Sequence, residues 1–312
     1  MILSEKTKDK IKGCIYGQAI GDALGLGSEF MSKTDVERYY PDGLCKYDQI
    51  IQDYHRRRWE KGSWTDDTDM MLCIARARIK NHFDISRIAQ NFKDWFNSKP
   101  LGIGRHTYNV LSLADYTQNP MRAADIVWQL SRGKNAANGA LMRTSILATS
   151  PIISEKEIAD ICHLTHPDSR CMGSCVLIVK VIQNLIFQNT QLNRSALKDI
   201  AVRYDHRIDE YIEKALDKNL SALSLDDQFM GYTLKTMAAA LWCMWHCNCF
   251  EDGLLAIVNQ GGDADTNAAV SCALLGAKYG FSNIPQYYTD NLRQQQTLED
   301  LYKKILIDLE SL

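Results

Sequence analysis

Apolar residues recur every three or four positions along most of the chain. Ile85, Ile88, Ala89 and Phe92 show this spacing clearly, and it predicts an amphipathic helix over residues 85–96. The pattern predicts further helices over residues 9–26, 70–77, 121–130, 141–149, 155–164, 174–187, 195–216, 234–245, 251–258, 267–279 and 298–309. No stretch alternates apolar and polar residues with the two-residue period of a strand. We therefore expect an all-α protein, a compact single-domain orthogonal bundle of about a dozen helices over residues 1–312.

The first predicted helix carries a glycine at every fourth position, namely Gly13, Gly17, Gly21 and Gly25. These glycines fall on one face of a helix, where they permit very close packing against a neighbour. They do not form a phosphate-binding loop, because no Gly-Lys-Ser/Thr sequence follows them. Glu29 lies just past the end of this helix and, taken alone, looks like a surface acid.

Composition and charge exclude several classes of protein. The chain has 312 residues, of which 46% are hydrophobic and 24% charged, as in globular proteins. A net charge of -2 gives no electrostatic argument for a nucleic-acid or membrane partner. Residues 1–6 lack the layout of a signal peptide, and the apolar run over 237–250 is too short to span a membrane. We expect a cytoplasmic protein, with no membrane and no sequence-specific nucleic acid among its partners.

Ten cysteines without a secretory signal are most simply reduced thiols in a cytosol. Cys243, His246, Cys247 and Cys249 are close enough in sequence to suggest zinc. However, they belong to an apolar, helix-like run with no turn between the ligands. This context favours core packing over a zinc site.

Two acidic stretches open predicted helices at opposite ends of the chain. Gly261 and Gly262 precede Asp263, Asp265 and Thr266, and the apolar run follows. One acid would suffice as a helix N-cap, whereas two acids and a hydroxyl also suit a hard divalent cation.

The second acidic stretch repeats this chemistry, with Gly62 before Thr65, Asp66 and Asp67. If the two helix starts face each other, at least four carboxylates share one pocket. Such crowding is costly unless cations neutralise it, and two neighbouring metal ions are one solution.

Two polar stretches between predicted helices are candidates for substrate binding. Residues 135–143 combine small residues with a helix entry, which suits either an anion site or a plain loop. In residues 165–169, Asp168 or Ser169 would cap a helix, and His166 before Pro167 is held extended and can point into a cleft. Residues 30–62 are irregular and contain a basic run at 55–59, which suits a solvated face or a lid over the acidic site.

These motifs together make the chain resemble the ADP-ribosylglycohydrolase family, of the dinitrogenase-reductase-activating glycohydrolase type. The resemblance runs over nearly the whole chain and rests on five motifs in the family's order. They are residues 13–25 with Glu29, 64–68, 138–143, 165–168 and 261–266.

The resemblance implies an all-α fold with a binuclear centre of two divalent cations, Mg²⁺ or Mn²⁺, in a cleft. The implied metal ligands are Thr65, Asp66, Asp67, Asp263, Asp265 and Thr266. Glu29 matches an acid near the metals on a movable segment, and Asp67 and Glu29 are the implied catalytic residues. The implied substrate-binding residues are Gly102, Gly104, Asn138, Gly139, Met142, Arg143, His166 and Asp168.

By the same resemblance, the protein hydrolyses the bond between C1″ of ADP-ribose and an acceptor, with a protein arginine as the first expectation. The metals would orient the distal ribose and activate water, and Asp67 or Glu29 would carry the proton. Neither the sequence nor the resemblance decides between direct attack by water and prior ring opening. We expect the protein to act as a monomer and to release ADP-ribose.

Two departures from the family pattern leave other functions open. Ala136 and Ala137 stand where many relatives have glycine or serine near the phosphates, and Gly102 stands where several arginine-directed relatives have an acid. The acceptor can then be a serine, a small ribosylated molecule or a nucleic-acid end. A non-catalytic ADP-ribose-binding member of the fold is a further alternative, but all six implied ligand positions retain oxygen donors.

Overall fold

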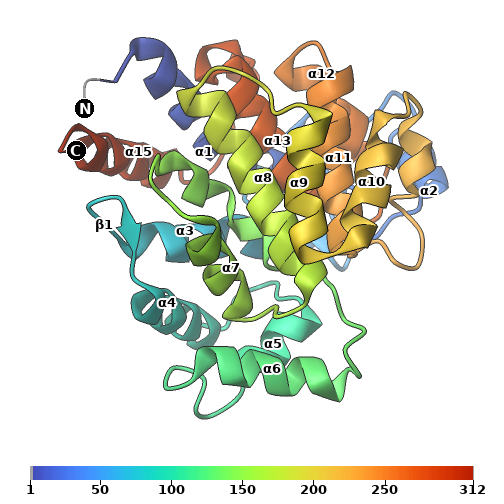
Figure 1. The fold of residues 1–312 in the computed structure, drawn as a ribbon. Helices are drawn as coiled ribbons and strands as arrows, with labels where there is room; N and C mark the ends of the chain where they lie inside the picture. The colour runs from blue at the N-terminus through green and yellow to red at the C-terminus, as the bar shows by residue number, and fades with distance from the viewer. Residues whose placement is uncertain (1–2, 312) are drawn as a thin grey trace.

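Helices make up almost all of the secondary structure in the computed structural model, which describes residues 3–311 (Figure 1). Met1, Ile2 and Leu312 lie outside the described residues. The prediction that residues 1–6 are not a signal peptide therefore falls partly outside the described residues. The α-helices in the described range are α1 (Glu5–Gly25), α2 (Lys33–Tyr39), α3 (Asp66–Arg76), α4 (Ile85–Asn97), α5 (Arg105–Leu111), α6 (Pro120–Leu130), α7 (Glu155–His163), α8 (Ser169–Phe187), α9 (Arg194–Tyr204), α10 (His206–Leu216), α11 (Thr233–His246), α12 (Phe250–Val258), α13 (Ala264–Tyr279), α14 (Gln286–Asp290) and α15 (Gln295–Glu310).

Short 3₁₀ helices and one small hairpin complete the structure. The 3₁₀ helices are η1 (Tyr47–Gln49), η2 (Arg56–Arg58), η3 (Leu141–Arg143), η4 (Ser145–Thr149), η5 (Leu220–Leu223) and η6 (Phe281–Asn283). The strands β1 (Arg78–Ile79) and β2 (His82–Phe83) pair antiparallel across a turn in which Lys80 and Asn81 have positive φ. The all-α prediction is confirmed. The hairpin was not predicted, because two residues per strand are too few for an alternating pattern to show.

Two predicted helices are different in the structure. The helix expected over 195–216 is two helices, because Asp205 is extended, with φ −157°, and its carboxylate accepts the N–H of Arg207 as the N-cap of α10. The α-helix expected over 141–149 is instead the 3₁₀ pair η3 and η4. There the hydroxyls of Thr144 and Thr149 donate to carbonyls three residues earlier, a local bond that competes with α-helical geometry.

The glycine face of α1 packs directly on the backbone of α13. A Cβ placed at Gly13, Gly17 or Gly21 would lie 2.2–2.3 Å from a carbonyl oxygen of α13, and one at Gly25 would lie 2.5 Å from the carbonyl of Ala264. The four carbonyls belong to Ala264, Ala268, Cys272 and Gly276, which also repeat every four residues. The predicted close packing is therefore present, and it holds the two helices side by side along their lengths (Figure 1).

Helix α8 lies at the centre of the bundle, with α7, α9, α11 and α13 around it (Figure 1). It is the one helix within residues 3–311 that is long and apolar enough to cross a membrane, but 72% of that stretch is buried inside the protein. Its apolar side chains, such as Val176, Ile178 and Ile182, are fully buried against these neighbours. The composition of α8 is thus that of a core helix.

We expect Gly17→Ala to lower the free energy of unfolding by about 3 kcal/mol, because its Cβ would meet the carbonyl oxygen of Cys272 at 2.2 Å. Urea denaturation measures this change. The matched control is Gly104→Ala, since a Cβ there has no atom within 4 Å. Equal stability of the two variants would contradict the close packing of α1 on α13.

Candidate active site

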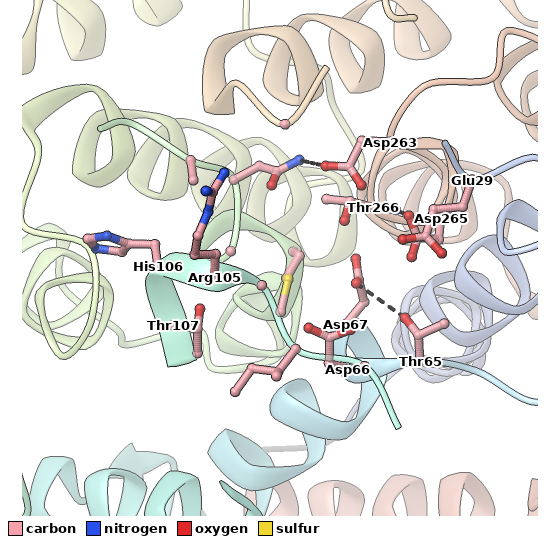
Figure 2. A pocket seen from close by; sticks show the side chains of 18 of the residues that line it. Glu29, Thr65, Asp66, Asp67, Arg105, His106, Thr107, Asp263, Asp265 and Thr266 are labelled. Atoms are coloured by element: carbon pink, nitrogen blue, oxygen red, sulfur yellow. Dashed lines mark hydrogen bonds between the residues drawn. The ribbon is translucent and has the colours of Figure 1, made fainter. Parts of the chain in front are cut away.

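A cavity that we call the main pocket has a volume of about 680 Å³ and lies where the N-terminal ends of α3, α5 and α13 meet (Figure 2). It is lined by Glu29, Phe30, His55, Arg58, Trp59, Thr65, Asp66, Asp67, Leu101, Gly102, Ile103, Gly104, Arg105, His106, Thr107, Asn135, Ala137, Asn138, Gly139, Met142, His166, Gly231, Asp263, Asp265 and Thr266. All six predicted metal ligands and Glu29 are in this set. Segments far apart in the sequence therefore bring the two acidic helix starts together.

Carboxylates crowd one end of the main pocket. Oxygen atoms of Glu29, Asp263 and Asp265 lie within 4.8 Å of one another, an arrangement that can hold a metal ion. Asp66 and Asp67, at the start of α3, face this group across the cavity (Figure 2). Because like charges at such distances repel strongly when buried, this end of the pocket is suited to cations.

A turn at Gly261 and Gly262 places the α13 acids beside Glu29. Both glycines have positive φ, and a Cβ at Gly262 would lie 2.0 Å from the carbonyl oxygen of Leu225. The turn is bonded to the segment that follows α1: the N–H of Phe30 donates to Gly262 O at 2.6 Å, and the N–H of Gly262 donates to Met31 O at 2.7 Å. These paired bonds fix Glu29 next to the start of α13.

Asp22 fixes the start of α3 from beneath the pocket. Its carboxylate is fully buried and accepts the N–H groups of Thr65 at 2.9 Å and Thr68 at 3.0 Å, and the Thr68 hydroxyl at 2.6 Å. The sequence places Asp22 after Gly21 but gives no signal for this role. Asp22 thereby ties Asp66 and Asp67, which lie between its two partners, to α1.

Burial raises the pKa of every acid in this group. It raises the pKa of Asp22 and of Asp66 to about 7, and that of Asp67 and Asp265 well above the usual range. Neighbouring carboxylates raise the pKa of Asp67 and Asp265 further. The Oδ1 atom of Asp67 is buried without a hydrogen-bond donor. Unsatisfied, mutually repelling carboxylate oxygens fit a site for divalent cations.

The acid beside the pocket mouth is held by a basic segment that was expected to be a solvated face or a lid. His55 Nε2 lies 2.6 Å from Glu29 Oε2, and its charge lowers the pKa of Glu29 against the larger, opposite effect of burial. Arg56 is buried and donates from Nε to Gly27 O at 2.8 Å and from Nη2 to Glu29 O. Residues 55–59 therefore brace the Glu29 segment, while Arg58 and Trp59 line the pocket.

The main pocket is also lined by six predicted substrate-binding residues, which are Gly102, Gly104, Asn138, Gly139, Met142 and His166. Asn138 lies directly beside the acids, because its Nδ2 donates to Asp263 Oδ2 at 2.8 Å. Burial lowers the pKa of His166 well below its usual range, so the ring is neutral. Its Nδ1 is 2.7 Å from Thr165 Oγ1, and its Nε2 has no hydrogen-bond partner.

Two predicted substrate-binding residues, Arg143 and Asp168, are not among the residues that line the main pocket. Arg143 is fully buried behind it, with its guanidinium 4.3 Å from the Phe92 ring centroid and Nη2 2.6 Å from Thr165 Oγ1. Asp168 is the N-cap of α8 and accepts hydrogen bonds from the side chain of Arg170. The motif spacing could not separate these supporting positions from the pocket wall.

Sequence reasoning also missed residues that line the pocket. Arg105, His106 and Thr107 open α5 directly after Gly104, and Asn135 Nδ2 lies 2.9 Å from His106 Nδ1. The sequence did contain a clue to these residues. Gly102 and Gly104 were predicted to bind substrate, and the residues that directly follow them line the same pocket.

The cysteine-rich stretch is only partly core packing: Cys243 and Cys247 are buried, but the expected continuous helix ends at His246 and a turn separates it from α12. Cys243 is buried, and His246 Nε2 is 3.1 Å from the carbonyl oxygen of Ala215. Cys249 is exposed and accepts the N–H of Asp252. Within the described residues, the one group of three side chains placed to hold a metal is that of Glu29, Asp263 and Asp265.

Comparison with known proteins agrees with this geometry. The sequence model of the family described as ADP-ribosylglycohydrolase matches residues 3–311. The chain is 29% identical to the ADP-ribosylarginine hydrolase Tri1 of Serratia proteamaculans (strain 568), over 98% of this chain and 81% of that protein. It is 27% identical to the ADP-ribosyl-[dinitrogen reductase] glycohydrolase of Rhodospirillum rubrum, over 91% and 90%. A solved structure called ADP-ribosylglycohydrolase-related protein complex superimposes with a TM-score of 0.79 at 25% identity, covering 97% of this chain and 98% of that one.

We expect the metal-free protein to lose stability as the pH rises from about 4 to about 7. Asp22 and Asp66 have a pKa of about 7 in the folded state, above the usual aspartate value, so the folded state favours their protonated forms. The stability that this preference provides is complete below about pH 4 and is lost as the pH rises through 7. Thermal unfolding in EDTA measures the decline.

Added Mg²⁺ or Mn²⁺ should raise the melting temperature more at about pH 8 than at about pH 5, because the carboxylates must be deprotonated to bind a cation. In an Asp263→Asn, Asp265→Asn variant the metal increment should disappear at both values. A metal effect that is independent of pH would contradict the assignment of these carboxylates to a cation site.

Proposed function

The chain belongs to the ADP-ribosylglycohydrolase family, and we propose that it hydrolyses the bond between C1″ of ADP-ribose and a protein arginine in a metal-dependent reaction. The family consists of glycosidase-type hydrolases. The observation that carries the proposal is the acidic end of the main pocket, where Glu29, Asp263 and Asp265 converge opposite Asp66 and Asp67. The arginine linkage is supported by the name of the Serratia relative, an ADP-ribosylarginine hydrolase.

Six side chains would hold two divalent cations, Mg²⁺ or Mn²⁺. They are Thr65, Asp66 and Asp67 from the start of α3, and Asp263, Asp265 and Thr266 from the start of α13. When bound, the cations would orient the hydroxyls of the distal ribose and make a nearby water more acidic. Their positive charge would also offset the repulsion that raises the pKa of these carboxyls.

The two proposed catalytic carboxylates differ in how they are held. Asp67 has one oxygen without a hydrogen-bond donor, so this oxygen is free to take a proton from the attacking water. Glu29 shares its carboxylate with His55, which can pass a proton to or from it. As the water oxygen bonds to C1″, the bond from C1″ to the acceptor nitrogen breaks and its electron pair stays on that nitrogen. The neutral guanidine that departs takes up the proton that the water gave to the carboxylate, and so leaves as guanidinium.

The acids also favour the transition state electrostatically. Cleavage of a glycosidic bond leaves positive charge on the anomeric carbon, and a low-dielectric pocket strengthens its attraction to nearby carboxylates. Burial of Asp66, Asp67 and Asp265 provides such an environment.

The opposite end of the main pocket would bind the remainder of ADP-ribose. Asn138, Gly139, Met142 and His166 offer an amide, a close backbone approach, an apolar contact and a neutral imidazole. A Cβ at Gly139 would lie 3.1 Å from the His166 ring, so glycine keeps the wall thin there. Arg143 and Asp168 would act indirectly, through Thr165 and the start of α8.

We further propose that the protein acts as a cytoplasmic monomer. All ten cysteines are free thiols in the structure, which suits a reducing compartment.

A release assay tests the function. Purified protein is mixed with arginine-ADP-ribosylated protein in Mg²⁺, in Mn²⁺ and in EDTA, and free ADP-ribose is measured. We expect release only with a divalent cation. An Asp263→Ala, Asp265→Ala variant should lose at least about 100-fold in rate. Mutating residues that only hydrogen-bond to metal ligands already lowers activity or metal affinity by about 10–100-fold.

The matched control is Asp115→Ala, an exposed acid outside the pocket, which should keep wild-type activity. A serine-ADP-ribosylated protein tests the linkage, and faster release from it would overturn the arginine assignment. Metal-independent release would contradict the proposed mechanism.

A further inference from the structure

A second cavity opens from the main pocket beside Asp66. This side pocket has a volume of about 570 Å³, and its wall includes Trp59, Thr65, Asp66 and Gly102, all of which also line the main pocket. Beyond the shared wall it is lined by Glu60, Ser63, Trp64, Asp69 and Arg293, among others. None of these five belongs to the proposed metal or substrate sites.

Two of the six proposed metal ligands lie where the two cavities adjoin. Thr65 and Asp66 line both, whereas Asn138 and His166 line only the main pocket. If the distal ribose sits among the acids and the rest of ADP-ribose extends toward His166, the bond to be cleaved lies near the junction. The group on the other side of that bond then points into the side pocket.

We propose that the side pocket is the acceptor site and that it recognises the arginine side chain from which ADP-ribose is removed. This inference rests on the proposed function and adds to it a location and a set of residues for the acceptor.

The lining of the side pocket has the chemistry of a site for a planar cation. The carboxylate of Asp69 is held in place by two indole N–H groups, from Trp64 at 2.9 Å and from Trp95 at 3.2 Å. A carboxylate held in a fixed orientation is a suitable partner for a guanidinium, which binds such groups with two parallel hydrogen bonds. Asp66 adds a carboxylate where the two cavities adjoin.

The two arginines of the side pocket are already engaged and leave this acidity available. Arg58 donates to the carbonyl oxygen of Leu101 at 2.9 Å, and its guanidinium lies 4.5 Å from the Trp59 ring centroid. Arg293 forms an ion pair with Glu60 at 3.2 Å.

Gly102 lies on the wall that the two cavities share. A Cβ at this position would lie 3.2 Å from Asp66 Oδ1 and 3.2 Å from the Trp59 ring, and larger side chains would extend further into the junction. Gly102 stands where several arginine-directed relatives have an acid. The side pocket still contains carboxylates, because Asp66 and Asp69 line it.

Two variants test the acceptor site with an ADP-ribosylated arginine peptide as substrate. Asp69→Asn removes a charge with little change in shape, and Ser63→Trp fills the cavity without touching that carboxylate. We expect each to raise KM for the peptide about tenfold with little change in kcat. The affinity for free ADP-ribose, measured by calorimetry, should stay within about twofold of wild type, because ADP-ribose lacks the acceptor. Asp94→Asn, an exposed aspartate on α4, is the matched control.

An unchanged KM in both variants would overturn the proposal, as would a parallel loss of affinity for ADP-ribose. If the wild-type protein binds these ligands without turnover, the proposed reaction fails, but the acceptor site is still decided by binding. The peptide should then bind more tightly than ADP-ribose, and Asp69→Asn should remove the difference. Equal affinities in the wild-type protein would overturn the acceptor site.

Discussion

The contact between α1 and α13 is the constraint on which the rest of the structure depends. Both helices present small residues at four-residue intervals, so their backbones approach more closely than side chains normally allow. This contact aligns the end of α1 with the start of α13, and the paired bonds between Phe30, Met31 and Gly262 continue the alignment into the loops. Asp22, on α1, then holds α3 against the same pair. The acidic site is thus built on the close contact between the backbones of α1 and α13.

The site concentrates negative charge and places little positive charge directly against it. Glu29 has His55 as a partner, but among the described residues no lysine or arginine side chain forms an ion pair with Asp66, Asp67, Asp263 or Asp265. The nearby His166 is neutral because it is buried. Such an arrangement is unfavourable for an empty protein and favourable for a protein that binds cations. The unpaired carboxylates therefore lower the stability of the metal-free protein at the site of the proposed reaction.

Sequence reasoning identified the helical class, the glycine face and the acids that converge, because each leaves a local pattern. It failed where the outcome depends on tertiary packing. Arg143 and Asp168 belong to the same motifs as Asn138 and His166, yet their side chains turn to Phe92 and Arg170, and no spacing reveals that choice. Arg105 and the hairpin at Lys80 were missed because short elements carry too few residues for a period to appear. The side pocket left no pattern in the sequence, because its wall comes from η2 and the residues after it, from α3, and from the segments before α5 and α15.

The contact between α1 and α13 also has a consequence for folding during synthesis on the ribosome. Helix α1 leaves the ribosome well before α13, because more than 200 residues separate them in the chain. Until α13 is made, the glycine face of α1 has no native partner, and the backbone that it exposes must be solvated or held by other contacts. The contact has a large sequence separation, so it is also costly in loop closure. The pocket built on this contact therefore forms only after α13 has been made, and a chain cut before α13 would carry the acids at the start of α3 without those at the start of α13.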